Sequence, residues 1–108
     1  MIARVWRGAT LAEDADAYAG YLEETGMRNA REIPGSRGTL VLRRVRGGYA
    51  EFETILLFEK LEDVRGFAGH ELEAAVFFEL DDKYLVEREL EVRHYEVDVH
   101  LEPVSTAR

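Results

Sequence analysis

Cysteine is absent from this chain of 108 residues, and serine occurs only as Ser36 and Ser105. Without cysteine the protein has no disulfide, no thiolate nucleophile and no cysteine-ligated metal or iron–sulfur site. No serine nucleophile motif, no glycine-rich phosphate loop and no His-Glu-x-x-His metal motif occurs either. The chain therefore lacks the commonest sequence signatures of catalysis.

Long apolar runs and a basic surface are also missing. No run approaches the roughly 20 apolar residues of a membrane-spanning helix, and the charged start of the chain differs from a secretory signal. The formal net charge of -8 disfavours nucleic acid and anionic membranes as partners, because both bind basic surfaces. We therefore expect a cytoplasmic protein with no nucleic-acid and no membrane partner.

The length and composition fit one folded domain. Hydrophobic residues make up 46% of the chain and charged residues 33%, as in ordinary globular proteins. We expect a single domain over residues 1–102, followed by a C-terminal tail over residues 103–108 that begins at Pro103.

Residues 49–69 contain the clearest structural pattern. From residue 50 to residue 58 every second side chain is apolar except Thr54, which predicts a strand with one mostly apolar face. After Lys60 the spacing becomes helical, with Leu61, Val64 and Phe67 on one side. Gly69 is a residue type that commonly ends helices. The segment predicts a long strand leading into a short helix.

The rest of the chain supplies elements on both sides of this unit. We predict a strand over residues 2–7 bounded by Gly8, and a helix that starts at a Thr10–Glu13 capping box and ends at Gly26. A connector (residues 27–35), a second strand (37–46) and a Gly47-Gly48 hairpin turn follow. Beyond residue 69 we predict a short helix within residues 70–78, an acidic loop (79–83) and a final strand (90–99).

This order predicts an α+β fold of the ferredoxin-like βαββαβ type, with two helices on one face of an antiparallel sheet. Apolar residues occur on both sheet faces, and two helices cover only one of them. The simplest cover for the other face is a second copy of the chain, so we predict a homodimer through the sheet.

His94 is the strongest candidate for proton transfer, because an imidazole titrates near neutral pH. A structural or exposed histidine is the alternative. His94, Glu96, Asp98 and His100 also alternate on one strand face, where a metal could bind. A solvated edge strand explains the same pattern, and nothing marks a third ligand from another element, so we predict no metal site.

Aromatic side chains could line an apolar pocket between the helices and the sheet, or could simply form the core. Trp6, Tyr18, Phe58 and Phe67 are the candidates for the pocket. Trp6 is the most suggestive, because its indole N–H usually finds a hydrogen-bond acceptor when the ring is buried.

Several short motifs resemble a known family. They are residues 2–6, Pro34-Gly35-x-x-Gly38, residues 56–60, residues 64–69, Ala74-Ala75 and residues 94–97. Their order and spacing resemble the antibiotic biosynthesis monooxygenase-like proteins of the dimeric α+β barrel superfamily. The resemblance implies a ferredoxin-like protomer, a homodimer whose sheets form a barrel, and a pocket between sheet and helices.

Relatives in this family include cofactor-independent oxygenases of aromatic polyketides and haem-degrading enzymes. The haem-degrading pattern has Asn on the first strand, Trp at the end of the third strand and His after the second helix. The matching positions here are Arg7, Phe58 and Val76, and all three differ. Since Val76 cannot ligate iron, we expect no haem and no other cofactor.

The resemblance therefore implies a cofactor-independent monooxygenase acting on a small aromatic or apolar substrate. In that case Trp6, Tyr18, Phe58 and Phe67 would surround the substrate, and His94 would transfer the proton. The alternative is a non-catalytic homodimer that binds a small ligand or has a structural role.

Overall fold

The strand β3 (Tyr49–Phe58) lies at the centre of the molecule, in a computed structural model that describes residues 1–104. It pairs antiparallel with β2 (Ser36–Arg46) on one side and with β1 (Ile2–Leu11) on the other. The far edge of β1 pairs with two short strands, β4 (Leu85–Arg88) and β5 (Arg93–Glu96). The sheet order is β2-β3-β1-β4, with β5 following β4 along the same edge of β1.

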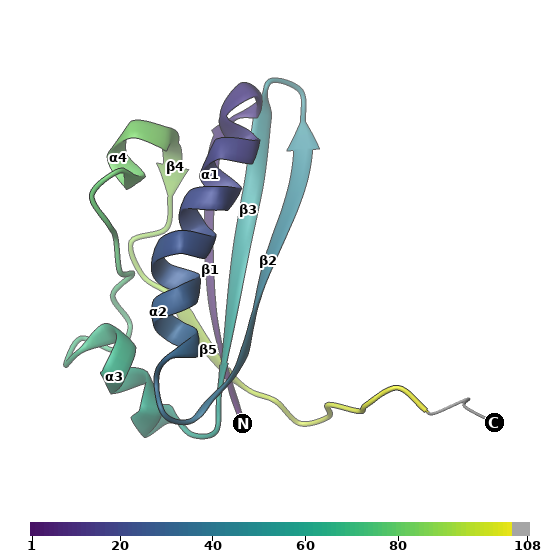
Figure 1. The fold of residues 1–108 in the computed structure, drawn as a ribbon, viewed down its shortest axis with the longest axis vertical. Helices are drawn as coiled ribbons and strands as arrows, with labels where there is room; N and C mark the ends of the chain where they lie inside the picture. The colour runs from purple at the N-terminus through teal and green to yellow at the C-terminus, as the bar shows by residue number, and fades with distance from the viewer. Residues whose placement is uncertain (105–108) are drawn as a thin grey trace.

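The helical segments all lie on one face of this sheet (Figure 1). The first is a continuous run made of a 3-10 turn (Ala12–Asp14), α1 (Ala15–Leu22), a π-helical turn (Glu23–Met27) and α2 (Arg28–Arg31). A second 3-10 turn (Leu61–Val64) leads into α3 (Arg65–Ala68), and α4 (Asp81–Tyr84) is a single turn. This is the predicted α+β arrangement with helices on one face. Within residues 1–104 no helix is both long and apolar enough to cross a membrane.

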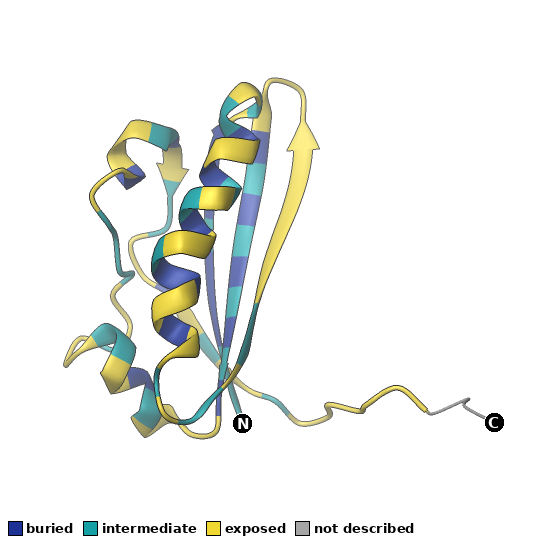
Figure 2. Ribbon diagram, viewed as in Figure 1, coloured by how far each residue is buried: buried dark blue, intermediate teal, exposed yellow. Residues whose placement is uncertain are grey.

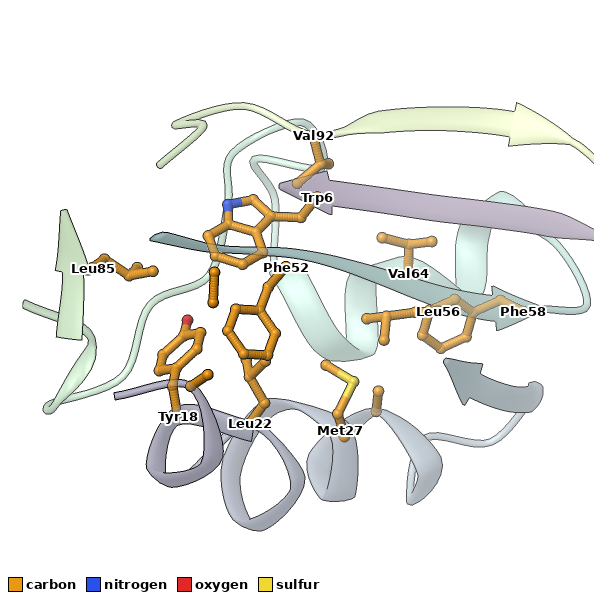
Figure 3. Close-up of a cluster of buried hydrophobic side chains, with 13 residues drawn as sticks. Trp6, Tyr18, Leu22, Met27, Phe52, Leu56, Phe58, Val64, Leu85 and Val92 are labelled. Atoms are coloured by element: carbon orange, nitrogen blue, oxygen red, sulfur yellow. The ribbon is translucent and has the colours of Figure 1, made fainter. Parts of the chain in front are cut away.

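The alternation along β3 behaves as predicted. Every second residue of this strand is buried beneath the helices, as the banding of β3 in Figure 2 shows. Thr54 is the only polar member of this buried set. The core joins this row to α1 and to Met27 (Figure 3).

β1 is longer than the sequence predicted. It continues through Gly8 to Leu11, because Gly8 lies under the ring of Trp6: a Cβ atom there would be 2.4 Å from Cη2 of that ring. Thr10 is fully buried in the strand and donates its hydroxyl to the carbonyl of Leu11. The predicted capping box is therefore wrong, and the helical run begins at Ala12 without a side-chain cap.

The first helical run also passes Gly26, where the sequence predicted its end. Gly26 is buried in the π-helical turn, and a Cβ atom at this position would be 3.5 Å from the Phe78 ring. The predicted connector at Met27 is wrong, because Met27 and Ala30 are buried helical residues of the core.

The region after α3 differs most from the prediction. Gly69 has φ +73° and ends α3 as expected, but residues 70–78 form no helix. Instead Ala74 bridges Glu91, the Ala75 amide donates to the carbonyl of Leu90, and the Val92 amide donates to the carbonyl of Glu73. The predicted final strand (90–99) is shortened to β5, and β4 before it was not predicted. Residues 90–92 between the two strands bond to this segment. The predicted acidic loop contains α4, and residues 105–108 of the predicted tail lie outside the described part.

Candidate functional site

A small cavity lies between the sheet and the first helical run. Its volume is about 40 Å³, enough for a few water molecules at most. The walls are mainly apolar and come from β1, β3, α1, the π-helical turn, α3 and residues 76–78. Ligand pockets for small organic molecules usually measure about 300–1,000 Å³, so such a molecule fits only if part of the wall moves.

Residues 76–78 are the part of the wall with the fewest backbone restraints. Within the described chain, Val76 and Phe77 make no backbone–backbone hydrogen bond. The Phe77 ring packs edge-on against Trp6 at 6.2 Å, and the guanidinium of Arg88 lies 4.6 Å from its centroid. Apolar packing therefore holds this segment closed. We refer to residues 76–78 as the wall segment.

Trp6 forms one side of the cavity and is 8% exposed. Its indole Nε1 donates a hydrogen bond of 2.8 Å to the carbonyl of Glu89, in the gap between β4 and β5. The expectation that this N–H has an acceptor is thus met within the protein, and the bond fixes the ring over the cavity.

A buried pair of polar side chains anchors the C-terminal end of the wall segment. The Tyr18 hydroxyl donates to Oδ1 of Asp81 at 2.9 Å, and Oδ2 of Asp81 accepts the Phe78 amide at 2.7 Å. Burial and the adjacent Asp81 raise the pKa of the Tyr18 phenol, so it remains a donor. Nearby, the Leu80 amide donates to the Tyr21 hydroxyl at 2.8 Å.

Arg4 holds the other end of the same region. Its Nη2 donates to the carbonyl of Ala74 at 2.8 Å, its Nη1 donates to the carbonyl of Leu72, and its guanidinium lies 5.6 Å from the Phe67 ring centroid. Arg4 is 2% exposed and lines the cavity. Burial lowers its pKa to about 10. None of the ion pairs found within residues 1–104 involves Arg4.

His94 is the cross-strand partner of Arg4. Its Nε2 lies 3.1 Å from Nη1 of Arg4; since Arg4 can only donate, we assign Nε2 as the acceptor and place the ring proton on Nδ1. Burial and the charge of Arg4 lower the pKa of His94, while Glu73 opposes the shift. The neutral, basic form is therefore favoured.

The predicted pocket residues divide into two groups. Trp6, Tyr18 and Phe67 line the cavity, whereas Phe58 is fully buried in the core away from it. His94 is not part of the wall either and reaches the cavity only through Arg4. The roles of these residues in binding and catalysis remain predictions.

Arg4 was not among the site residues predicted from the sequence. A signal was present, because Arg4 and Trp6 lie on the same face of one strand and Trp6 was already a candidate. A charged residue beside a buried tryptophan on the apolar side of a strand is unusual.

The positions that the haem-degrading pattern would use do not suit that cofactor. Val76 does lie on the cavity wall, but it has no ligating atom, and no histidine of residues 1–104 lines the cavity. Arg7 points to the opposite face of the sheet, where it pairs with Glu51 at 3.2 Å. These residues do not fit a haem group.

No three metal-ligating side chains converge within residues 1–104. β5 ends at Glu96, so Asp98 and His100 lie beyond the sheet and do not share a strand face with His94.

Comparison with known proteins identifies the fold. The sequence matches no protein-family model, and no curated protein is significantly similar to it in sequence. Among solved structures, a candidate antibiotic biosynthesis monooxygenase from Bacillus cereus matches with a TM-score of 0.69 and 14% identity, over 97% of this chain and 98% of that one.

A second solved structure is the haem-degrading protein MhuD from Mycobacterium tuberculosis, with two haems in its active site. It matches with a TM-score of 0.58 and 16% identity, over 94% of this chain and all of that one. Similarity at this level of identity establishes the fold. The chain therefore has the fold of the antibiotic biosynthesis monooxygenase-like proteins, as the sequence motifs implied.

Proposed function

We propose that this protein is a cofactor-independent monooxygenase that oxidises a small aromatic substrate in the cavity between sheet and helices. The observation that carries the proposal is the cavity itself: an apolar space beside a basic pair, the buried Arg4 and the half-buried His94. The solved structures of the same fold support it, since one is described as a monooxygenase and the other degrades haem. Because a substrate needs more than 40 Å³, we infer that the wall segment opens on binding.

The chemistry that suits such a site starts with an acidic C–H or O–H group. A base removes a proton from a ring methylene activated by a neighbouring carbonyl, and the resulting enolate passes one electron to O₂. Recombination gives a hydroperoxide, and loss of water leaves a ketone, so that R₂CH₂ and O₂ become R₂C=O and H₂O. No metal or flavin is required, and an apolar enclosure shields the intermediates from solvent.

His94 is the proposed base. Its neutral form is favoured, and it lies at the edge of the cavity behind Arg4. Because Nε2 of His94 accepts the hydrogen bond from Arg4, proton transfer to it requires Arg4 to release this nitrogen and the substrate to reach it, which places the reactive carbon at this end of the cavity.

The experiment is oxygen uptake by the purified protein with a panel of anthrones and naphthohydroquinones, followed by mass spectrometry of products formed under ¹⁸O₂. We expect one labelled oxygen atom in the product, and a loss of rate in His94→Gln but not in His100→Gln. Uptake no faster than in buffer would refute the proposal. Binding of the same compounds without turnover would favour the alternative, a non-catalytic ligand-binding protein.

We also propose that the protein is a homodimer through the sheet face opposite the helices. Leu40 and Leu42 on β2 are 50% and 46% exposed, and they continue a row that includes Ile55 and Leu57 on β3. An exposed apolar row of this kind commonly marks a protein interface. The absence of cysteine suits a reducing compartment, and we propose a cytoplasmic location.

Light scattering tests the dimer. Leu40→Lys should convert a dimeric mass into a monomeric one, because it places a charge in the middle of the apolar row. Leu80→Lys is the matched control: Leu80 is 41% exposed but lies on the helical side. A monomeric wild-type protein, or equal effects of the two variants, would contradict this interface.

A further inference from the structure

Arg4 is a buried cation whose partners are all neutral. It is 2% exposed, and it donates to two backbone carbonyls and to the ring nitrogen of His94. In a chain with 22 acidic residues, none of the side chains described forms an ion pair with it. A buried charge without a counter-charge is costly, so this arrangement needs an explanation.

The one acidic residue among those lining the cavity does not pair with Arg4. Asp81 lines the cavity, but one of its oxygens accepts the Tyr18 hydroxyl and the other accepts the Phe78 amide. Arg4 meanwhile lines the same space, and its Nε–H donates to no atom of residues 1–104. The cavity thus presents a guanidinium with spare hydrogen-bonding capacity.

We propose that Arg4 is the recognition group for the substrate, and that this substrate is an aromatic molecule bearing a planar oxyanion, either a carboxylate or the enolate or phenolate of an acidic ring. The inference rests on the cavity being the binding site of the proposed function, but it does not depend on the oxygen chemistry. It adds a substrate class, since an apolar cavity alone would accept neutral aromatics equally well.

Three features of the site favour this ligand. A guanidinium binds a planar oxyanion through parallel charge-assisted hydrogen bonds. The apolar and aromatic walls, which include Trp6, Phe67 and Phe77, match an aromatic ring. Holding the two carbonyls would need only a neutral donor, and apart from its contact with the Phe67 ring the charge of Arg4 has no partner in the fold, which a ligand anion would supply.

The same contact would couple binding to opening of the wall. The carbonyls that Arg4 holds belong to Leu72 and Ala74, just before the wall segment. An oxyanion that takes over these donors removes the Arg4 contacts at the N-terminal end of that segment, where the backbone bonds of Glu73 and Ala75 remain, while the Phe78–Asp81 bond keeps the other end in place. An anion would therefore replace part of the contacts that close the cavity.

Calorimetric titration with three probes of similar size tests the proposal: 2-naphthoate, 2-naphthol and the uncharged 2-naphthamide. We expect 2-naphthoate to bind about tenfold or more tightly than 2-naphthamide, as charge-assisted hydrogen bonds imply. If the phenolate is the preferred form, 2-naphthol binds with release of one proton, which is measured by repeating the titration in buffers of different ionisation enthalpy.

Arg4→Met should abolish the preference for the anion, and Arg4→Lys should keep part of it. Arg7→Met is the matched control, because Arg7 lies on the same strand but on the opposite face, paired with Glu51. It should bind the probes as the wild type does. If Arg4→Met does not fold, the test can be made on the wild-type protein. A bound anion weakens the effect of Arg4 on His94, so the pKa of His94 measured by NMR should rise when the anion binds.

Equal affinity for the acid and the amide, no binding of either anion, or an unchanged pKa of His94 would overturn the proposal. Its failure is distinguishable from failure of the proposed function. Anion binding without oxygen uptake leaves the Arg4 site intact and refutes the monooxygenase. Turnover of a neutral substrate at a rate that Arg4→Met does not change would support the monooxygenase and refute the proposed role of Arg4.

Discussion

Removal of the Tyr18 hydroxyl should destabilise the protein, because it breaks a hydrogen bond between two buried side chains. Tyr18 is 1% exposed and Asp81 is 4% exposed, and the bond between them is 2.9 Å long. A hydrogen bond to a charged group contributes about 1.5–3 kcal/mol, and the buried carboxylate left without its donor keeps the full penalty of desolvation. We therefore expect Tyr18→Phe to lower the free energy of unfolding by about 1.5–3 kcal/mol.

The measurement is urea unfolding followed by circular dichroism, at one fixed protein concentration because the stability of a dimer depends on concentration. For a chain of this length 1 kcal/mol corresponds to roughly 5 °C in Tm, so the thermal midpoint should fall by about 7–15 °C. Tyr84→Phe is the control: the Tyr84 ring packs 5.7 Å from that of Tyr18, but its hydroxyl makes no hydrogen bond within the described residues. This variant should stay within about 0.5 kcal/mol of the wild type.

A double-mutant cycle with Asp81→Ala isolates the bond itself. The single Asp81 variant also leaves the Phe78 amide without an acceptor, so its cost exceeds that of Tyr18→Phe. The coupling energy should be about 1.5–3 kcal/mol. A coupling below about 0.5 kcal/mol would refute the reasoning that this bond anchors the wall segment.

The same site predicts a dependence on alkaline pH. Burial and Asp81 raise the pKa of Tyr18 in the folded state above its ordinary value of 10.0. The contribution of Tyr18 to stability is therefore fully present below pH 10. It is lost as the pH rises further, because only the unfolded chain can release the phenol proton there. Tyr18→Phe should lose less stability than the wild type over this range.

Two further predictions concern the strand β1 and its neighbour. Gly8→Ala should lower the free energy of unfolding by about 1–3 kcal/mol and shift the tryptophan fluorescence, because the added methyl group displaces the Trp6 ring. Gly20→Ala is the control, at an exposed helical site with no atom within 4 Å. It should raise the free energy of unfolding by about 0.5–1 kcal/mol. Because folding lowers the pKa of His94, its contribution to stability should be fully present above pH 6.5, the ordinary pKa of histidine. This contribution should fall as the pH drops below 6.5, since the unfolded chain takes up the proton first. A urea titration between pH 7.5 and 5 should show this slope in the wild type and a shallower one in His94→Gln.

The fold was largely predictable because the strands carry a strong period of two. The row from Ala50 to Phe58 is buried as predicted, and the Gly47-Gly48 hairpin joins β2 to β3 as expected. The errors came from glycines interpreted as boundaries. Gly8 and Gly26 both lie inside regular elements: Gly8 makes room for the Trp6 ring, and Gly26 lies in ordinary contact with the Phe78 ring. Contacts such as the one between Gly26 and Phe78 join residues far apart in the sequence, so local patterns do not reveal them.

The site was less predictable for the same reason. Trp6, Tyr18 and Phe67 were picked out as bulky aromatics and do line the cavity, but Phe58 has the same character and lies in the core. The two polar anchors, Arg4 and Asp81, were missed. Each acts through a partner about 60 or more residues away in the chain, and no spacing rule connects such positions.

The break in the last strand explains why the cavity exists. An unbroken strand along β1 would satisfy its edge and leave nothing to hold residues 73–75. Because residues 90–92 leave the ladder, the Leu90 carbonyl and the Val92 amide bond instead to Ala75 and Glu73, and the chain that follows Ala75 must cross the cavity as the wall segment. Two side chains from opposite sides, Arg4 and Asp81, then fix its ends. Of these anchors only Arg4 brings a positive charge to the cavity, so we expect the wall to open at that end, where an anionic substrate would bind.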